Sequence, residues 1–78
     1  MKIYDFQGKK NICGQCLKEA RKAKKLSQLE LAEEMQKKGI TLEWDSISRI
    51  ELGTRFVADY ELIFFSQILE KDVEWFLS

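Results

Sequence analysis

Cysteine has the strongest metal-binding and redox chemistry of the residue types in this chain, and its two cysteines form the sequence CGQC. Cys13 and Cys16 are spaced like zinc ligands, but a structural zinc ion takes four ligands, and the chain has no histidine and no third cysteine. A thioredoxin-type pair is expected beside a βαβ unit, which the sequence does not indicate. The same spacing also places two small apolar side chains on one helix face. We therefore expect structural cysteines and no bound metal, with redox use or a metal-bridged dimer as the alternatives.

Catalytic groups of other kinds are also scarce. The chain has no histidine, no glycine-rich phosphate loop and no pair of acids in a recognisable cleft. The acidic residues of segments 26–39 and 59–69 are expected to lie on solvated helix faces. The sequence therefore predicts a protein that is not an enzyme and needs no cofactor and no small-molecule substrate.

The segment LEWDSISRIELG, at residues 42–53, combines helical spacing with side chains that can recognise DNA bases. If Ile47 and Ile50 point toward a core, helical geometry gathers five other residues on the outer side. These are Trp44, Asp45, Ser48, Arg49 and Leu52. A guanidinium can bridge O6 and N7 of guanine, so Arg49 is the strongest candidate for base recognition.

The acidic residues of this segment argue against a polyanionic partner. Glu43 and Asp45 repel phosphates, although Asp45 can accept a hydrogen bond from the amino group of cytosine. Trp44 can pack on a thymine methyl group or donate its N–H to a phosphate. We therefore predict modest non-specific affinity and a more selective contact with bases.

Length and composition fit one small helical domain. The chain has 78 residues, no proline and four glycines, which favours helices over a turn-rich β fold. No apolar run approaches the roughly 18 residues of a membrane span. The N-terminus MKIYDFQGKK lacks the apolar region of a secretory signal. We expect an all-α cytoplasmic protein without a membrane partner.

Charge is unevenly distributed along the chain, although the formal net charge is zero. Residues 1–28 contain eight Lys/Arg and two Asp/Glu, a balance of +6. Residues 29–78 contain five Lys/Arg and eleven Asp/Glu, a balance of −6. The basic part is compatible with a surface for nucleic acid, and a solvated surface of mixed charge is the alternative.

Apolar spacing predicts an N-terminal arm at residues 1–10 and a domain at residues 11–78. Within this domain, helices are expected at residues 11–25, 26–39, 44–52, 59–69 and 72–77.

Residues typical of helix ends support these boundaries. Asn11 is a plausible N-cap, and Ser27 with Glu30 forms a capping-box pattern. Gly39 and Gly53 are expected to follow the ends of the second and third helices. Two further caps are expected at Asp72 and at either Thr41 or Glu43.

The sequence LKEARKAKKLSQLELAEEM, followed by ISRIELGTR and a final EWFL, resembles the phage-repressor-like helix-turn-helix family of lambda repressor, Cro and XRE-type proteins. The resemblance covers about residues 12–77. The stretch between Ala32 and Ile47 is longer than usual in the family. Together with RFVADYEL, it resembles a variant with a lengthened second helix. The resemblance implies a compact five-helix lambda-repressor-like domain.

The family resemblance also implies roles for individual residues. The helix at 44–52 would enter the major groove of DNA, and Arg21 and Glu51 would form an ion pair that joins the first helix to the third. The residues expected to hold phosphates are Ser27, Gln28, Thr54 and Arg55, with Lys9 and Lys10 in the arm.

Apolar residues near the C-terminus exceed what one helix face needs for the core. These residues are Ile63, Phe64, Ile68 and Trp75. The family commonly dimerises through its C-terminal helices, so the resemblance implies a homodimer interface here. Deeper packing in the core is the alternative.

Together these features predict a sequence-specific regulator of transcription that binds double-stranded operator DNA as a homodimer, most simply as a repressor. The alternative is an antitoxin-like or adaptor protein that has the same fold and binds another protein instead of DNA. The acidic second half of the chain and the surplus apolar residues favour this alternative.

Overall fold

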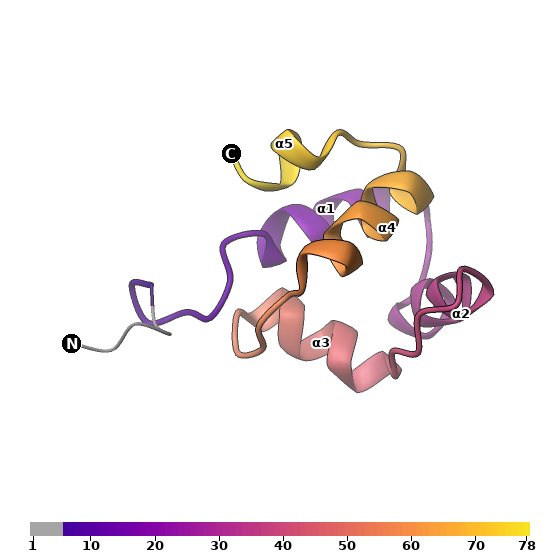
Figure 1. The fold of residues 1–78 in the computed structure, drawn as a ribbon, viewed down its shortest axis with the longest axis horizontal. Helices are drawn as coiled ribbons and strands as arrows, with labels where there is room; N and C mark the ends of the chain where they lie inside the picture. Colours follow the sequence, from indigo (N-terminus) through magenta and orange to yellow (C-terminus); the bar gives the residue numbers. More distant parts are fainter. Residues whose placement is uncertain (1–5) are drawn as a thin grey trace.

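The computed structural model describes residues 6–78, and this part of the chain is built from helices. They are α1 (Gly14–Ala23), α2 (Gln28–Lys37), α3 (Trp44–Leu52), α4 (Asp59–Leu69) and α5 (Val73–Phe76). Figure 1 shows α3 at one edge of the molecule and α5 at the opposite edge, with α1 and α4 between them. The all-α prediction is confirmed. None of the helices described here is long and apolar enough to cross a membrane.

Helix α1 is shorter than the segment 11–25 that the sequence predicted. Asn11 lies outside the helix, but its Oδ1 accepts a hydrogen bond from the backbone N–H of Gly14 at 2.9 Å. Asn11 therefore caps the helix from a position three residues before Gly14, which is the first helical residue. At the other end, Lys25 has a left-handed φ of 59°, which is incompatible with a continuing helix.

Helix α2 begins with the predicted capping box. The N–H of Glu30 donates to Ser27 Oγ at 3.0 Å, and the N–H of Ser27 donates to Glu30 Oε1 at 2.8 Å. These two bonds satisfy groups that the start of a helix leaves without partners. The helix continues past Ala32 to Lys37, and segment 38–43 then leads to α3. The long stretch before Ile47 is thus part helix and part loop.

Helix α3 has the predicted limits, Trp44 and Leu52. Glu43 occupies the N-cap position, but its side chain makes no capping hydrogen bond. Gly53 follows the helix with φ 83°, a left-handed conformation that glycine adopts without steric cost. Helix α4 also keeps its predicted limits, and Asp72 precedes α5 without a side-chain cap.

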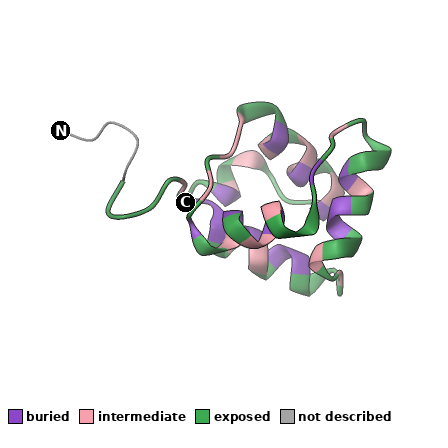
Figure 2. Cartoon of the chain, turned by 90° about the horizontal axis from the view of Figure 1, so that it is seen from below, coloured by how far each residue is buried: buried purple, intermediate pink, exposed green. Residues whose placement is uncertain are grey.

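In residues 6–78, one apolar core lies among the helices, and Figure 2 shows buried and exposed residues mixed along the helical ribbon. Its largest fully buried side chains are Leu17, Leu31, Met35, Ile47, Ile50, Phe65, Leu69 and Phe76. Helices α1 and α3 approach closely at Gly14, where a Cβ atom would lie 2.3 Å from the carbonyl oxygen of Ile50. The absence of a side chain at Gly14 therefore allows α3 to pack directly against the start of α1.

Candidate nucleic-acid interface

Helix α3 has a buried side and an exposed side. Ile47 and Ile50 have no exposed surface and hold the helix against the core. On the outer side, Trp44, Asp45, Arg49 and Leu52 are exposed and Ser48 is half-buried. The structure therefore gathers the residues of α3 that the sequence selected for base contacts on one accessible face.

Arg49 has an acidic neighbour on this exposed face. Its Nη2 lies 3.7 Å from Asp45 Oδ2, one helical turn away, and 3.4 Å from Ser46 Oγ. Both charged side chains are about half exposed, at 56% and 51%. Exposed pairs of this spacing contribute about 0.5 kcal/mol or less, so a stronger partner can displace Asp45 from the guanidinium.

Arg21 and Glu51 form the ion pair that the family resemblance implies. Arg21 Nε and Nη2 donate to the two carboxylate oxygens at 2.7 and 3.1 Å. The third guanidinium nitrogen, Nη1, donates to the carbonyl oxygen of Leu26 at 2.8 Å. Both side chains are almost entirely buried. The pair links α1 to α3 and leaves neither residue accessible to a ligand.

Gln28, expected at a DNA phosphate, is tied to the same ion pair. Its Nε2 donates to Glu51 Oε1 at 3.1 Å, so its amide nitrogen is directed at α3. Ser27 is exposed, and its side chain is occupied by the capping box. The start of α2 is therefore bound to α3 through the hydrogen bond between Gln28 and Glu51.

Arg55 has a different partner from the phosphate that the sequence suggested. Its Nη1 and Nη2 each donate at 3.1 Å to a carboxylate oxygen of Glu61, whose side chain is only 6% exposed. Glu61 Oε1 also accepts a hydrogen bond from the backbone N–H of Ala58 at 2.9 Å. Arg55 Nη1 also donates to the backbone carbonyl oxygen of Phe56 at 2.8 Å. This network ties the turn between α3 and α4 to the start of α4.

Sequence reasoning does not identify Glu61, because an acid on a helix is expected to be solvated. Its position, three residues after the residue that precedes α4, is where a glutamate commonly bonds back to the start of a helix. That local pattern could have indicated the contact with Ala58. The pairing with Arg55 depends on the path of the intervening turn.

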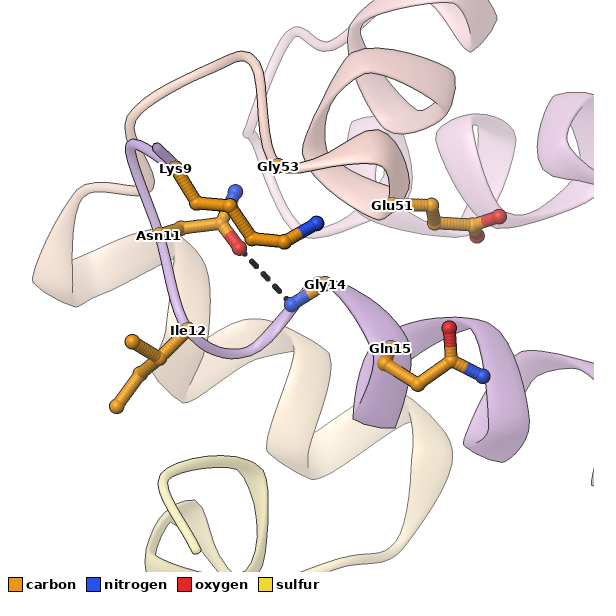
Figure 3. A pocket seen from close by; sticks show the side chains of 7 residues that line it. All are labelled: Lys9, Asn11, Ile12, Gly14, Gln15, Glu51 and Gly53. Carbon is orange, nitrogen blue, oxygen red and sulfur yellow. Dashed lines mark hydrogen bonds between the residues drawn. The ribbon is translucent and has the colours of Figure 1, made fainter. Parts of the chain in front are cut away.

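Residues 1–5 of the predicted N-terminal arm lie outside the described residues, and residues 9–11 lie against the end of α3. The N–H of Lys10 donates to the carbonyl of Gly53 at 2.8 Å, and Asn11 Nδ2 donates to the carbonyls of Ile50 and Arg55 at 3.0 and 2.8 Å. Figure 3 shows the Lys9 side chain running along Gly53 toward the start of α1, beside a small hollow of about 140 Å³. Lys9 and Lys10 are both exposed. The arm thus adds two cations beside α3.

Thr54 continues the same surface after α3. Its side chain is exposed, and Oγ1 donates to the carbonyl of Arg49 at 3.2 Å. The hydroxyl oxygen keeps acceptor capacity, and the residue borders Gly53. Thr54, Lys9 and Lys10 therefore lie at the C-terminal end of α3.

The four apolar residues expected at a dimer interface do not share one environment. Phe64, Ile68 and Trp75 are partly buried and pack against the core, as the alternative interpretation required. The Trp75 ring meets Phe76 edge-on, with 5.2 Å between ring centroids. Ile63 is 48% exposed. Core packing therefore accounts for three of the four residues, and Ile63 alone among the four is about half exposed.

The two cysteines differ in burial. Cys13 is 3% exposed, and burial raises the pKa of its thiol above 9.0. Cys16 is half-buried, and both residues are free thiols. Within residues 6–78, no group of three or more cysteine or acidic side chains is arranged to hold a metal ion. These surroundings fit a structural Cys13.

A comparison of this chain with protein-family models, with curated proteins and with solved structures finds no significant match.

Proposed function

We propose that this protein binds double-stranded DNA in a sequence-specific manner and regulates transcription, with α3 in the major groove. The observation that carries the proposal is the way α3 is held. Ile47 and Ile50 are buried on one side, and the Arg21–Glu51 pair fixes the helix to α1. The opposite face is free to enter a groove about 12 Å wide, which admits an α-helix.

Base contacts are assigned to the exposed face of α3. Arg49 bridges guanine after leaving its weak contact with Asp45, and Asp45 accepts from a cytosine amino group. Ser48 and Trp44 make the neighbouring contacts. Because this face has both an arginine and an aspartate, its affinity for DNA of any sequence is modest. Its preference for particular bases is strong.

Contacts with the DNA phosphates are assigned to residues at the two ends of the helix-turn-helix unit, which is formed by α2 and α3. Lys9, Lys10 and Thr54 serve one end, and the exposed start of α2 at Ser27 serves the other. Such contacts set the position of the protein on the duplex and the dependence on salt. Arg55 is left out because its guanidinium is bound to Glu61.

A homodimer that represses transcription is the simplest form of this function. Two-fold related recognition helices bind half-sites about 34 Å apart on one side of the duplex. Ile63 is the exposed member of the apolar set on the C-terminal helices and is assigned to the dimer contact. Sedimentation as a monomer at tens of micromolar would remove this part of the proposal.

The test is selection of bound sequences from random duplex DNA. The native protein is expected to enrich a motif that contains guanine, and Arg49→Ala is expected to lose preference at that guanine, at a cost of about 1–3 kcal/mol. Lys37→Ala is a matched control that removes an exposed cation already paired with Glu34. If the native protein enriches no motif, the proposal fails.

A second candidate is an antitoxin-like or adaptor module that binds protein and has no DNA affinity. The exposed apolar residues beside acids between α2 and the start of α3 favour it, namely Leu29 and Trp44 near Glu33 and Glu43. Salt dependence separates the two candidates. The logarithm of a DNA affinity falls with the logarithm of salt concentration by about 0.9 per neutralised phosphate, whereas an apolar protein contact is much less sensitive.

A further inference from the structure

A groove lies between α2 and the start of α3, and its walls are two large exposed apolar side chains. Leu29 of α2 is 54% exposed and Trp44 of α3 is 55% exposed. The buried residues Ala32 and Leu42 also line the groove. An exposed indole on a concave surface is the kind of side chain that anchors protein–protein contacts, and the leucine beside it adds apolar contact area.

Acidic side chains line the same groove. Glu33 and Glu43 are both exposed, and no lysine or arginine of the described residues lines it with them. Neither carboxylate has an ion-pair partner within 4.0 Å in residues 6–78. The groove is therefore lined by apolar side chains, by Gln36 and by two carboxylates.

We propose that this groove binds a segment of a partner polypeptide in which an apolar side chain lies next to lysine or arginine. The charge of Glu33 and Glu43 selects a basic occupant and repels the phosphates of nucleic acid. The hollow has a volume of about 240 Å³. This is below the roughly 300–1,000 Å³ of small-molecule sites, and suits single side chains of a polypeptide.

Occupation of the groove controls DNA binding, because Trp44 belongs both to the groove and to the exposed face of α3. A partner packed on Trp44 covers the start of the helix that enters DNA. This regulatory step depends on the proposed function, whereas the binding of a basic segment does not.

The first experiment selects ligands from a random library of short peptides displayed on phage, with the folded native protein as the target. We expect enriched peptides to combine an apolar residue with lysine or arginine. Leu29→Ala and the double variant Glu33→Gln/Glu43→Gln should each weaken a selected synthetic peptide about tenfold or more, as measured by calorimetry. Leu77→Ala, which removes a similarly exposed leucine after α5, should leave the affinity unchanged.

The outcomes that overturn the proposal are distinct. No enrichment, enrichment of acidic peptides, or an affinity unaffected by Leu29→Ala each refutes it. Self-association that Leu29→Ala abolishes would make a second copy of this chain the occupant and would also refute it. Thermal melts of all variants show whether they are folded, which is expected because the substituted side chains are exposed.

The second experiment adds the selected peptide to the protein bound to its selected duplex. Displacement of the DNA supports the regulatory step, and a complex that holds peptide and DNA together overturns it. If the protein alone enriches no duplex, the proposed function fails, while peptide binding is still judged from the first experiment.

Discussion

Replacing Glu51 with alanine is expected to lower the free energy of unfolding strongly. The carboxylate accepts two hydrogen bonds from Arg21, at 2.7 and 3.1 Å, and one from Gln28 at 3.1 Å. Its side chain is 4% exposed, and that of Arg21 is 10% exposed. Alanine would therefore leave a nearly buried guanidinium with Leu26 as its one remaining hydrogen-bond partner among the described residues.

The expected loss follows from this burial. Removing one partner of a buried ion pair costs about 3–5 kcal/mol. The whole free energy of unfolding of a 78-residue domain is roughly 4–12 kcal/mol, at about 0.05–0.15 kcal/mol per residue. For a domain of this size, the loss corresponds to a decrease of roughly 12–40 °C in Tm. Glu51→Ala therefore removes a large part of the stability.

Urea unfolding followed by circular dichroism measures this loss, with thermal melts as a second measure. Glu51→Gln should fall between the native protein and Glu51→Ala, because the amide oxygen still accepts one hydrogen bond. The double variant Arg21→Met/Glu51→Met should be more stable than Glu51→Ala, since no buried charge is left unpaired. Lys37→Ala, which breaks an exposed pair, should leave Tm nearly unchanged.

Two results would refute this reasoning. The first is a Tm of Glu51→Ala equal to that of the native protein, which would show that the ion pair has no structural role. The second is a double methionine variant that is less stable than Glu51→Ala, because the cost would then come from lost charge attraction and not from an unpaired guanidinium.

Three further predictions concern other parts of the fold. Gly14→Ala should destabilise the protein by about 1–3 kcal/mol in urea unfolding, because the new Cβ would lie 2.3 Å from a backbone oxygen of α3; a stabilised variant contradicts this. In the native protein, iodoacetamide should modify Cys16 before Cys13, because Cys13 is buried and its thiol pKa is raised; equal rates in peptide mapping contradict this. Lys24 lowers the pKa of Glu70 below 4.5, so Glu70 adds stability above that pH and loses it as the pH falls through the folded value. The stability difference between the native protein and Glu70→Gln should therefore shrink between about pH 7 and about pH 3, and a constant difference in melts contradicts this.

Helix limits near strong local patterns could be predicted from the sequence. The capping box of Ser27 and Glu30, and the glycine after Leu52, depend on hydrogen bonds and backbone angles within a few residues. The predicted start of α1 was three residues too early, because Asn11 lies before the helix and caps it at Gly14. Local geometry therefore determined most of the secondary structure.

The ion pair between Arg21 and Glu51, which the family resemblance implies, is present in the structure. The resemblance did not give the partners of Gln28 and Arg55, which the structure ties to Glu51 and Glu61. Both residues were expected at phosphates. These intramolecular contacts depend on how α2, α3 and α4 meet in space, which the local sequence does not specify.

The sequence by itself determined the helical class, the limits of α3 and the side of α3 that faces outward. Periodicity and caps suffice for these features, since they depend on residues three or four positions apart. Only the tertiary structure decided that Phe64, Ile68 and Trp75 pack on the core, and that Leu29 and Trp44 form one groove. The physical reason is distance: a side chain's burial and charge partners depend on which helices meet in space, and residues remote in sequence supply them.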